Sequence, residues 1–236
     1  MKVLVTGASR GLGAALVERY LFNGAQVWGV GRSSAPARVP DGKRFIYTQC
    51  DVRDADSIRM TVRDMTETGF IPDIAVFNAG APTKDAADSF RFQSFRENFE
   101  TNLFGAVIWV EEFLPHFMKR GSGVFAAVSS QSVFRENHKD VVGYSASKLA
   151  LTKAFENLRL QYLPTGVRFV TFHPGRMSKV RNSVIGTTYS NAARIICVNT
   201  LAASPRPVVN FPALQYYMTR VLRFVPDAVF HRFIFR

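Results

Sequence analysis

Tyr144 and Lys148 are four residues apart in a segment whose composition favours a helix. Side chains at that spacing lie on one face of a helix, so the phenol and the amine point into the same space. A free phenol has a pKa of about 10, and a cation within roughly 4–6 Å stabilises the phenolate and lowers that pKa. Such a tyrosine can act as a general acid or base. Because the same pair also occurs on ordinary helices, its function depends on the residues around it.

A glycine-containing loop near the N-terminus could bind a phosphate. Residues 6–13 read Thr-Gly-Ala-Ser-Arg-Gly-Leu-Gly and directly follow a short apolar strand. The glycines permit a tight turn and let a pyrophosphate approach the N-terminus of the next helix, where free N–H groups favour an anion. The spacing is G-x-x-x-G-x-G, which differs from the commoner G-x-G-x-x-G pattern. In this strand–loop–helix context we expect a dinucleotide-binding loop.

Apolar runs typical of buried strands alternate with helical patterns along the whole chain. We expect strands at residues 3–5, 26–30, 44–48, 73–77, 123–128, 167–172 and 207–210. Helices are expected at 14–22, 55–68 and 95–119, and over a segment that holds Tyr144 and Lys148 and ends near 163. This alternation predicts an α/β fold with a doubly wound parallel sheet. Without a linker or repeat, the chain is expected to be one domain, 1–236, with a helical C-terminal extension at 211–236.

Composition excludes several classes of protein. The net charge is +12, but the basic residues are scattered, so nucleic-acid binding is not expected. The two cysteines and four histidines show no metal-ligand spacing, and we expect neither a metal site nor a disulfide. The N-terminus runs straight into the glycine loop, and no apolar run is long enough to span a membrane. We therefore expect a cytoplasmic protein, and a homodimer or homotetramer.

Seven elements in chain order resemble the short-chain dehydrogenase/reductase family, which has a Rossmann fold. The glycine motif matches Thr6, Gly7, Gly11 and Gly13, the Asp-Val pair matches Asp51 and Val52, and the Asn-Ala-Gly element matches Asn78, Ala79 and Gly80. The active-site asparagine, serine, tyrosine and lysine match Asn102, Ser130, Tyr144 and Lys148, and the Pro-Gly element matches Pro174 and Gly175. The resemblance covers about residues 1–176. It implies that Asn102, Ser130, Tyr144 and Lys148 are catalytic. The residues that it implies for a nicotinamide cofactor are Gly7, Ser9, Arg10, Gly11, Leu12, Gly13, Arg32, Ser33, Asp51, Val52, Asn78, Ala79, Gly80, Tyr144, Lys148, Pro174 and Gly175.

The resemblance also implies a mechanism, which is hydride transfer between nicotinamide and a small-molecule carbonyl or alcohol. Tyr144 would donate a proton to the developing alkoxide, and Lys148 would lower the pKa of that tyrosine and bond the nicotinamide ribose. Ser130 would hydrogen-bond the substrate oxygen, and Asn102 would hold a water that relays protons. Ser129 lies next to Ser130, and only the family alignment selects the second serine. The alternative for Asn102 is an exposed helical residue.

The choice of cofactor depends on the residues that meet the adenosine ribose. A carboxylate at the end of the second strand would bind the 2′-hydroxyl of NAD and repel a 2′-phosphate. Here that strand is followed by Arg32 and Ser33, and the glycine loop contributes Arg10. Arginine matches the geometry of phosphate, and both arginines stand where the family's NADP-preferring members place basic residues. We therefore expect NADP(H) rather than NAD(H), the alternative being that both arginines are merely solvated.

The substrate pocket is less well defined by the sequence. Candidate substrate-binding residues are Gln131, Phe134 and His138, which suggest a partly apolar pocket, and His138 is interpreted as a loop residue rather than a catalyst. Residues 33–43 are expected to form a surface loop, and the polar segment 176–191 to form a mobile lid. Many family members have a threonine five residues after the proline of the Pro-Gly element. Here Lys179 occupies that position, which puts a cofactor contact there in doubt.

The C-terminal segment has an apolar stripe of helical period. Its members, at spacings typical of one helix face, are Leu214, Tyr217, Met218, Val221, Leu222 and Val225. Three alternatives are open: the segment packs over the substrate cleft of its own domain, forms a subunit interface, or lies on a membrane surface with its arginines on anionic lipid.

Three functions follow for the whole chain. The first is an NADP(H)-dependent carbonyl reductase that uses Tyr144 as general acid/base. The others are a non-catalytic protein that senses NADP(H), and a reductase of lipid-like ketones on a membrane surface. The presence of Asn102, Ser130, Tyr144 and Lys148 favours an enzyme.

Overall fold

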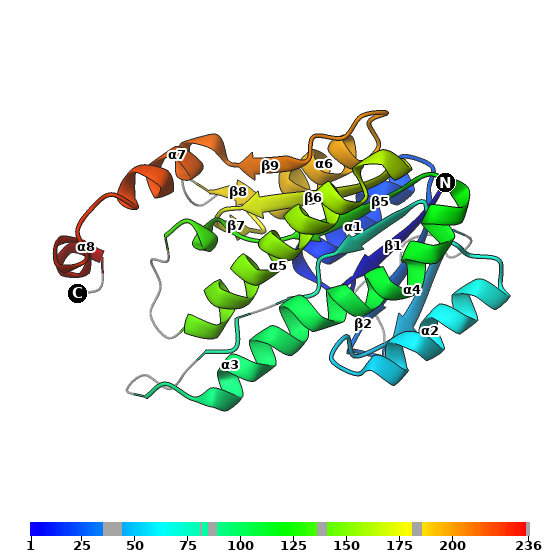
Figure 1. The fold of residues 1–236 in the computed structure, drawn as a ribbon, viewed down its shortest axis with the longest axis horizontal. Helices are drawn as coiled ribbons and strands as arrows, with labels where there is room; N and C mark the ends of the chain where they lie inside the picture. The colour runs from blue at the N-terminus through cyan, green and yellow to red at the C-terminus, as the bar shows by residue number, and fades with distance from the viewer. Residues whose placement is uncertain (35–43, 81, 85–88, 136–140, 181–185, 235–236) are drawn as a thin grey trace.

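The fold is seen in a computed structural model that describes residues 1–34, 44–80, 82–84, 89–135, 141–180 and 186–234 (Figure 1). Seven parallel strands form one sheet in the order β3-β2-β1-β4-β5-β6-β9. These strands are β1 Lys2–Thr6, β2 Gln26–Gly31, β3 Phe45–Gln49, β4 Ile74–Phe77, β5 Gly123–Val128, β6 Val167–Pro174 and β9 Val208–Phe211. The prediction of a doubly wound parallel sheet is confirmed.

Helices cover both faces of this sheet, α1 and α6 on one and α2, α4 and α5 on the other. The helices are α1 Gly11–Phe22, α2 Ala55–Glu67, α3 Phe92–Phe99, α4 Gly105–Arg120, α5 Val142–Gln161, α6 Tyr189–Thr200, α7 Ala213–Leu222 and α8 Asp227–Ile234. A π-helical turn, Glu100–Phe104, joins α3 to α4, and 3₁₀ turns occupy Gln131–Val133 and Leu163–Thr165. Two short strands, β7 Met177–Ser178 and β8 Thr187–Thr188, pair with each other.

The core has two layers because successive strand residues point to opposite faces. Val3 and Val5 of β1 pack with α1 and α6, whereas Leu4 between them packs with α2, α4 and α5. Trp109, Phe113 and other aromatic residues fill the second layer. The central strands β1, β4 and β5 are thus largely buried on both sides, as is typical of a parallel sheet covered by helices.

The order of the strands places a candidate site at the carboxyl ends of the central strands. From β1 the chain continues to β2 and β3 on one side, and then returns to β4 on the other side. Ligands of open α/β sheets bind at such a switch point, at the carboxyl ends of the strands. The loops after β1, β4, β5 and β6 all open there, and they carry the candidate functional residues.

The structure differs from the sequence predictions in two segments. Helix α6 was not predicted, and its first three residues fall inside the segment expected to be a lid, 176–191, which also includes β7 and β8. The single helix expected at 95–119 is continuous but contains the π-helical turn. Most of the loop expected at 33–43 lies outside the described residues.

Candidate active site

The glycine loop and the Asn-Ala-Gly element are bonded to each other. The side-chain amide of Asn78 donates to the carbonyls of Thr6 (3.1 Å) and Gly7 (3.2 Å), and the Thr6 hydroxyl accepts from the backbone N–H groups of Asn78 and Ala79. Gly7 has a φ of +68°, and a Cβ there would lie 2.8 Å from the Cα of Ala79. Only glycine allows this close approach. These contacts fix the loop that leads into the start of α1.

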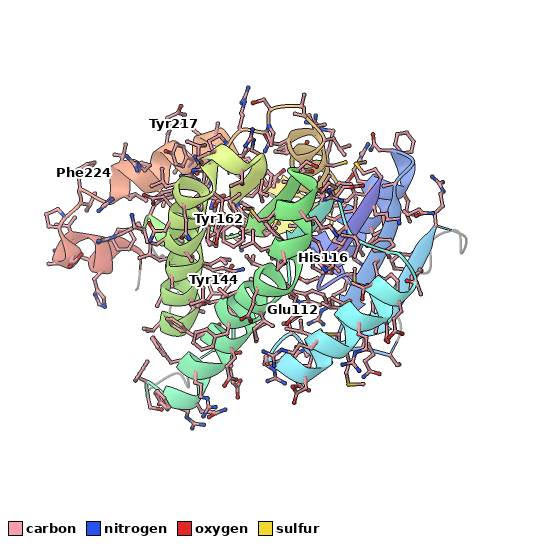
Figure 2. All side chains as sticks on the ribbon, turned by 45° about the vertical axis from the view of Figure 1, so that its right-hand side comes forward. Glu112, His116, Tyr144, Tyr162, Tyr217 and Phe224 are labelled. Carbon is pink, nitrogen blue, oxygen red and sulfur yellow. The ribbon has the colours of Figure 1, made fainter. Side chains whose placement is uncertain are left out.

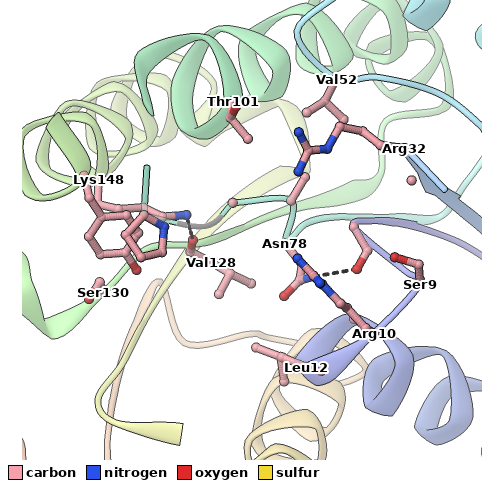
Figure 3. A pocket seen from close by; sticks show the side chains of 18 of the residues that line it. Ser9, Arg10, Leu12, Arg32, Val52, Asn78, Thr101, Val128, Ser130 and Lys148 are labelled. Atoms are coloured by element: carbon pink, nitrogen blue, oxygen red, sulfur yellow. Dashed lines mark hydrogen bonds between the residues drawn. The ribbon is translucent and has the colours of Figure 1, made fainter. Parts of the chain in front are cut away.

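Tyr144 and Lys148 lie one turn apart on α5, as the spacing predicts. The Lys148 amine is 6.0 Å from the centre of the Tyr144 ring and donates a 2.7 Å hydrogen bond to the carbonyl of Val128, at the end of β5 (Figure 3). Only 3% of Lys148 is exposed, and this burial lowers the pKa of its amine to about 8. Figure 2 shows Tyr144 on α5 in the middle of the molecule.

Asn102 lies in the π-helical turn, a feature that often occurs at functional sites. It is buried, so the alternative of an exposed helical residue is wrong. Its amide nitrogen donates to the Ser147 hydroxyl at 2.9 Å, and that hydroxyl donates to the Tyr144 carbonyl. Its Oδ1 is buried and finds no partner among the described residues. A Cβ on Gly80 would lie 2.5 Å from this oxygen and 2.9 Å from the Lys148 amine, so all three groups meet at one point.

The two serines after β5 have different environments. The Ser129 hydroxyl is buried and donates to the Lys148 carbonyl at 3.0 Å, while Thr152 lies 2.8 Å away. The Ser130 hydroxyl accepts a hydrogen bond from the N–H of Ser132 and begins a 3₁₀ turn. Ser129 is thus a strand-end hydroxyl bonded to backbone, and the more open Ser130 can donate its proton to a ligand.

A cavity of about 920 Å³ lies at the switch point of the sheet. It is lined by most of the residues that the sequence singled out: Gly7, Ser9, Arg10, Gly11, Leu12, Gly13, Arg32, Ser33, Val52, Asn78, Ala79, Gly80, Ser130, Tyr144, Lys148, Pro174 and Gly175. Figure 3 shows Arg10 and Arg32 at one end and Lys148 and Ser130 at the other. A long cavity with cations at one end suits a dinucleotide.

Two of the predicted catalytic and cofactor-binding residues, Asn102 and Asp51, do not line this cavity. Asn102 is absent from the lining, but its Oδ1 lies next to Gly80, which does line the cavity. The Asp51 carboxylate accepts hydrogen bonds from the Arg53 guanidinium, the shortest 2.6 Å, and this contact lowers its pKa. Val52, the second residue of the Asp-Val pair, does reach the cavity.

Sequence reasoning missed several lining residues. Arg53 adds a third cation near Arg32, and Met177 and Tyr189 line the cavity from β7 and α6. The Tyr189 ring lies 3.8 Å from where a Cβ of Gly11 would be, so α6 begins against the glycine loop. Met177 and Tyr189 both fall in the segment expected to be a lid, 176–191, but neither was named as a site residue, and α6 itself was not predicted.

The predicted substrate residues meet the C-terminal segment instead of the cavity. The Gln131 amide donates to the carbonyl of Pro212 at 3.3 Å, and the Phe134 ring lies 5.3 Å from that of Tyr216 in α7. His138 lies outside the described residues. The candidate substrate side of the cavity is therefore bordered by α7.

Comparison with known proteins identifies the family. The family model described as short chain dehydrogenase matches residues 1–187. The chain belongs to the short-chain dehydrogenase family. An uncharacterized oxidoreductase of Myxococcus xanthus is 31% identical over 185 residues, which are 73% of this chain and 70% of that protein. The chain is thus an oxidoreductase of the short-chain dehydrogenase type with a nicotinamide-binding Rossmann fold.

Solved structures share this fold. A short chain dehydrogenase from Burkholderia cenocepacia in complex with NADP has a TM-score of 0.79 and 23% identity, and covers 98% of this chain and 96% of its own. A 3-ketoacyl-(acyl-carrier-protein) reductase from Brucella melitensis complexed with NADH has a TM-score of 0.82 and 21% identity. The match covers 91% of this chain and 98% of the reductase. The two structures hold different cofactors.

Proposed function

We propose that the protein is an NADP(H)-dependent carbonyl reductase that converts a ketone to an alcohol, with Tyr144 as general acid/base. The observation that carries the proposal is the convergence of Ser130, Tyr144 and Lys148 at one end of a cavity whose other end is the glycine loop. The bound cofactor would supply the hydride. Side chains of the protein would bind the carbonyl oxygen and transfer the proton.

The residues present fit a dinucleotide. Gly7, Gly11 and Gly13 line the cavity without side chains that would fill it, and the start of α1 would offer its N–H groups to a pyrophosphate. Gly80, Pro174 and Gly175 border the cavity next to Lys148. We infer that these backbone segments hold the nicotinamide half.

Tyr144 and Ser130 would have different roles at the carbonyl oxygen of the substrate. Ser130 would donate a hydrogen bond to the oxygen and stabilise the negative charge that develops there. Tyr144 would transfer its proton to the same oxygen. The Lys148 amine, positively charged below its pKa of about 8, would stabilise the phenolate that remains.

Asn102 would help to return a proton to Tyr144 after each reduction. Its Oδ1 is buried without a partner and meets the Lys148 amine beside Gly80. Buried polar atoms of this kind usually bind ordered water. We infer that Oδ1 accepts from a water that also bonds the Lys148 amine, which would make Asn102 a positioning residue in a proton relay.

The NADP(H) preference rests on charge. Arg10 and Arg32 line the adenosine end of the cavity, and the cavity-lining residues after β2 are Arg32 and Ser33 rather than an acid. Two guanidinium groups attract a 2′-phosphate. The solved relatives hold NADP in one case and NADH in another, so they do not decide between the two. The cytoplasmic location and the homodimeric or homotetrameric state expected from the sequence stay predictions.

Turnover separates this proposal from a protein that only senses NADP(H). The test measures NADPH consumption with ketones, quinones and 3-oxoacyl compounds, alongside NADPH and NADH binding. We expect turnover of at least one class and tighter binding of NADPH. Tight NADPH binding without turnover of any compound would favour the sensor, and tighter NADH binding would contradict the cofactor assignment.

A further inference from the structure

The C-terminal helices are anchored to their own domain beside the candidate active site. The Gln215 side chain accepts from the backbone N–H of Arg176 at 2.9 Å, next to Gly175 of the cavity wall. Farther along, Arg135 forms a 2.8 Å ion pair with Asp227 and lies 4.2 Å over the ring of Phe230. One side of α7 and α8 therefore packs against its own domain, which is the first of the three alternatives for this segment.

Four of the six side chains in the predicted apolar stripe point away from the domain, whereas Leu222 and Val225 are half-buried. No residue of α7 is buried. The side chains that turn outward are 45–84% exposed and are Leu214, Tyr217, Met218, Val221 and Phe224. They recur at helical spacing on one face, while the polar Gln215 turns inward. Figure 1 shows α7 and α8 at one end of the molecule, and Figure 2 shows Tyr217 and Phe224 at its outer rim. We call this the outer tail face.

The charges near the outer tail face favour an anionic partner over a second copy of this chain. Arg223 and Arg232 are exposed, the first directly after α7 and the second on α8. The Arg220 guanidinium lies 5.7 Å from the centre of the Phe134 ring, on the side of α7 that meets the domain. Residues 205–226 contain no acidic residue, and Asp227 is paired with Arg135. A second copy would bring these cations against their equivalents at a net charge of +12 per chain. Anionic lipid headgroups would attract them.

We propose that the outer tail face docks on an anionic phospholipid surface, with its five apolar side chains at the headgroup–acyl boundary and the arginines among the phosphates. Exposed aromatic residues such as Tyr217 and Phe224 suit that boundary. None of the described helices is long and apolar enough to cross a membrane. The attachment proposed is one that lies along the surface.

Docking has a consequence for the substrate, which rests on the proposed function. Through Gln215 and Arg176, α7 touches the wall of the cavity at Gly175. A docked face would hold that end of the cavity near the bilayer. The carbonyl compound reduced would then be one with an apolar chain that partitions into lipid.

Flotation of the full chain with vesicles tests the docking without reference to turnover. One set of vesicles contains phosphatidylcholine alone, and the other contains equal parts of phosphatidylcholine and phosphatidylglycerol. We expect flotation with the anionic set, and little with the neutral set. The Tyr217→Ser/Val221→Ser double variant should partition about tenfold or more weakly.

Matched controls separate the face from general hydrophobicity and charge. Phe22→Ser/Val198→Ser also removes an aromatic and a valine side chain, which are 82% and 62% exposed on α1 and α6, and should float like the wild type. Arg223→Gln should weaken partitioning about fivefold, and Arg63→Gln should not. Equal flotation of the two double variants would overturn the proposal.

The mass of the protein in solution tests the alternative that the outer tail face binds a second copy. If the wild type does not float and its mass in solution falls in Tyr217→Ser/Val221→Ser but not in the control double variant, the face binds a second copy and the lipid proposal is wrong. If the wild type floats but reduces no carbonyl compound, docking stands and the proposed function fails. Chain-length series of ketones, assayed with anionic vesicles, then test the substrate: equal turnover of short and long ketones would contradict the apolar-chain inference.

Discussion

The Lys148 amine donates a 2.7 Å hydrogen bond to the carbonyl of Val128, in the interior beside the candidate active site. The contact joins α5, which carries Tyr144, to the end of β5, which leads to Ser130. One backbone carbonyl does not replace the water that a free ammonium would bind, so burial lowers the pKa of Lys148 to about 8.

Stability of the cofactor-free protein should therefore depend on pH through Lys148. Its folded-state pKa lies below the unfolded value of about 10.4, so the unfolded chain holds more protons between these values. The wild type should gain stability relative to Lys148→Met as the pH rises from about 8 to about 10.4, by about 3 kcal/mol. Urea unfolding at several pH values measures this. Lys153→Met, on the exposed side of α5, is the matched control, and a pH-independent difference for Lys148→Met would contradict the account.

Gly80→Ala should damage turnover more than stability. The added Cβ would lie 2.5 Å from Asn102 Oδ1 and 2.9 Å from the Lys148 amine, so both groups or the backbone of residue 80 must move. Displacement of a catalytic group by about 1 Å can cost about 10²-fold in rate, and we expect a loss of that order in kcat/KM.

Gly69→Ala controls for backbone strain in this experiment. Gly69 also has a positive φ, +71°, but a Cβ there meets nothing within 4 Å. It should lose about 1 kcal/mol of stability and keep its turnover. Unchanged turnover in a folded Gly80→Ala protein would refute the meeting of Asn102 and Lys148 as a functional arrangement.

Ser129→Ala and Ser130→Ala should separate structure from chemistry. Ser130→Ala removes the proposed donor to the substrate oxygen and should lower kcat by about 10²–10³-fold with little change in melting temperature. Ser129→Ala breaks buried hydrogen bonds to Lys148 and Thr152 and should cost about 1–2 kcal/mol of stability. The reverse pattern would assign the catalytic hydroxyl to Ser129.

Arg32→Ser should change the preference between cofactors. A charge-assisted hydrogen bond to phosphate contributes about 1.5–3 kcal/mol, so NADPH binding should weaken about 10–100-fold while NADH binding stays near its wild-type value. Arg53→Gln is a useful comparison, because Arg53 reaches the same cavity but its charge is paired with Asp51. Fluorescence titration of both cofactors measures the change, and equal weakening of NADPH and NADH would rule out a 2′-phosphate contact.

The sequence predicted the parts of the site that depend on loops at strand ends. Gly7, Asn78 and Ser130 each follow an apolar strand, and parallel strands bring such positions to one edge of the sheet. The sheet and the family are confirmed on this basis. The roles of Ser130, Tyr144 and Lys148 stay predictions that their geometry supports.

What the sequence did not predict depends on tertiary contacts. Residues 195–198, Ile-Ile-Cys-Val, favour a strand by composition but lie in α6, which packs on α1 with a 2.6 Å hydrogen bond between Thr200 and Tyr20. The stripe on α7 has helical period, yet periodicity does not say which side faces the domain. Gln131 and Phe134 were assigned to the substrate because the path of the C-terminal segment past them was unknown.

Deuterium transfer tests the central claim most directly. NADPH deuterated on its transferable position is incubated with the wild type and with Tyr144→Phe, in the presence of a carbonyl compound from the panel. We predict deuterium on the carbinol carbon of the wild-type product. Tyr144→Phe should bind NADPH normally and transfer deuterium about 10²–10⁴-fold more slowly. A Tyr144→Phe protein that transfers deuterium at the wild-type rate would contradict the account.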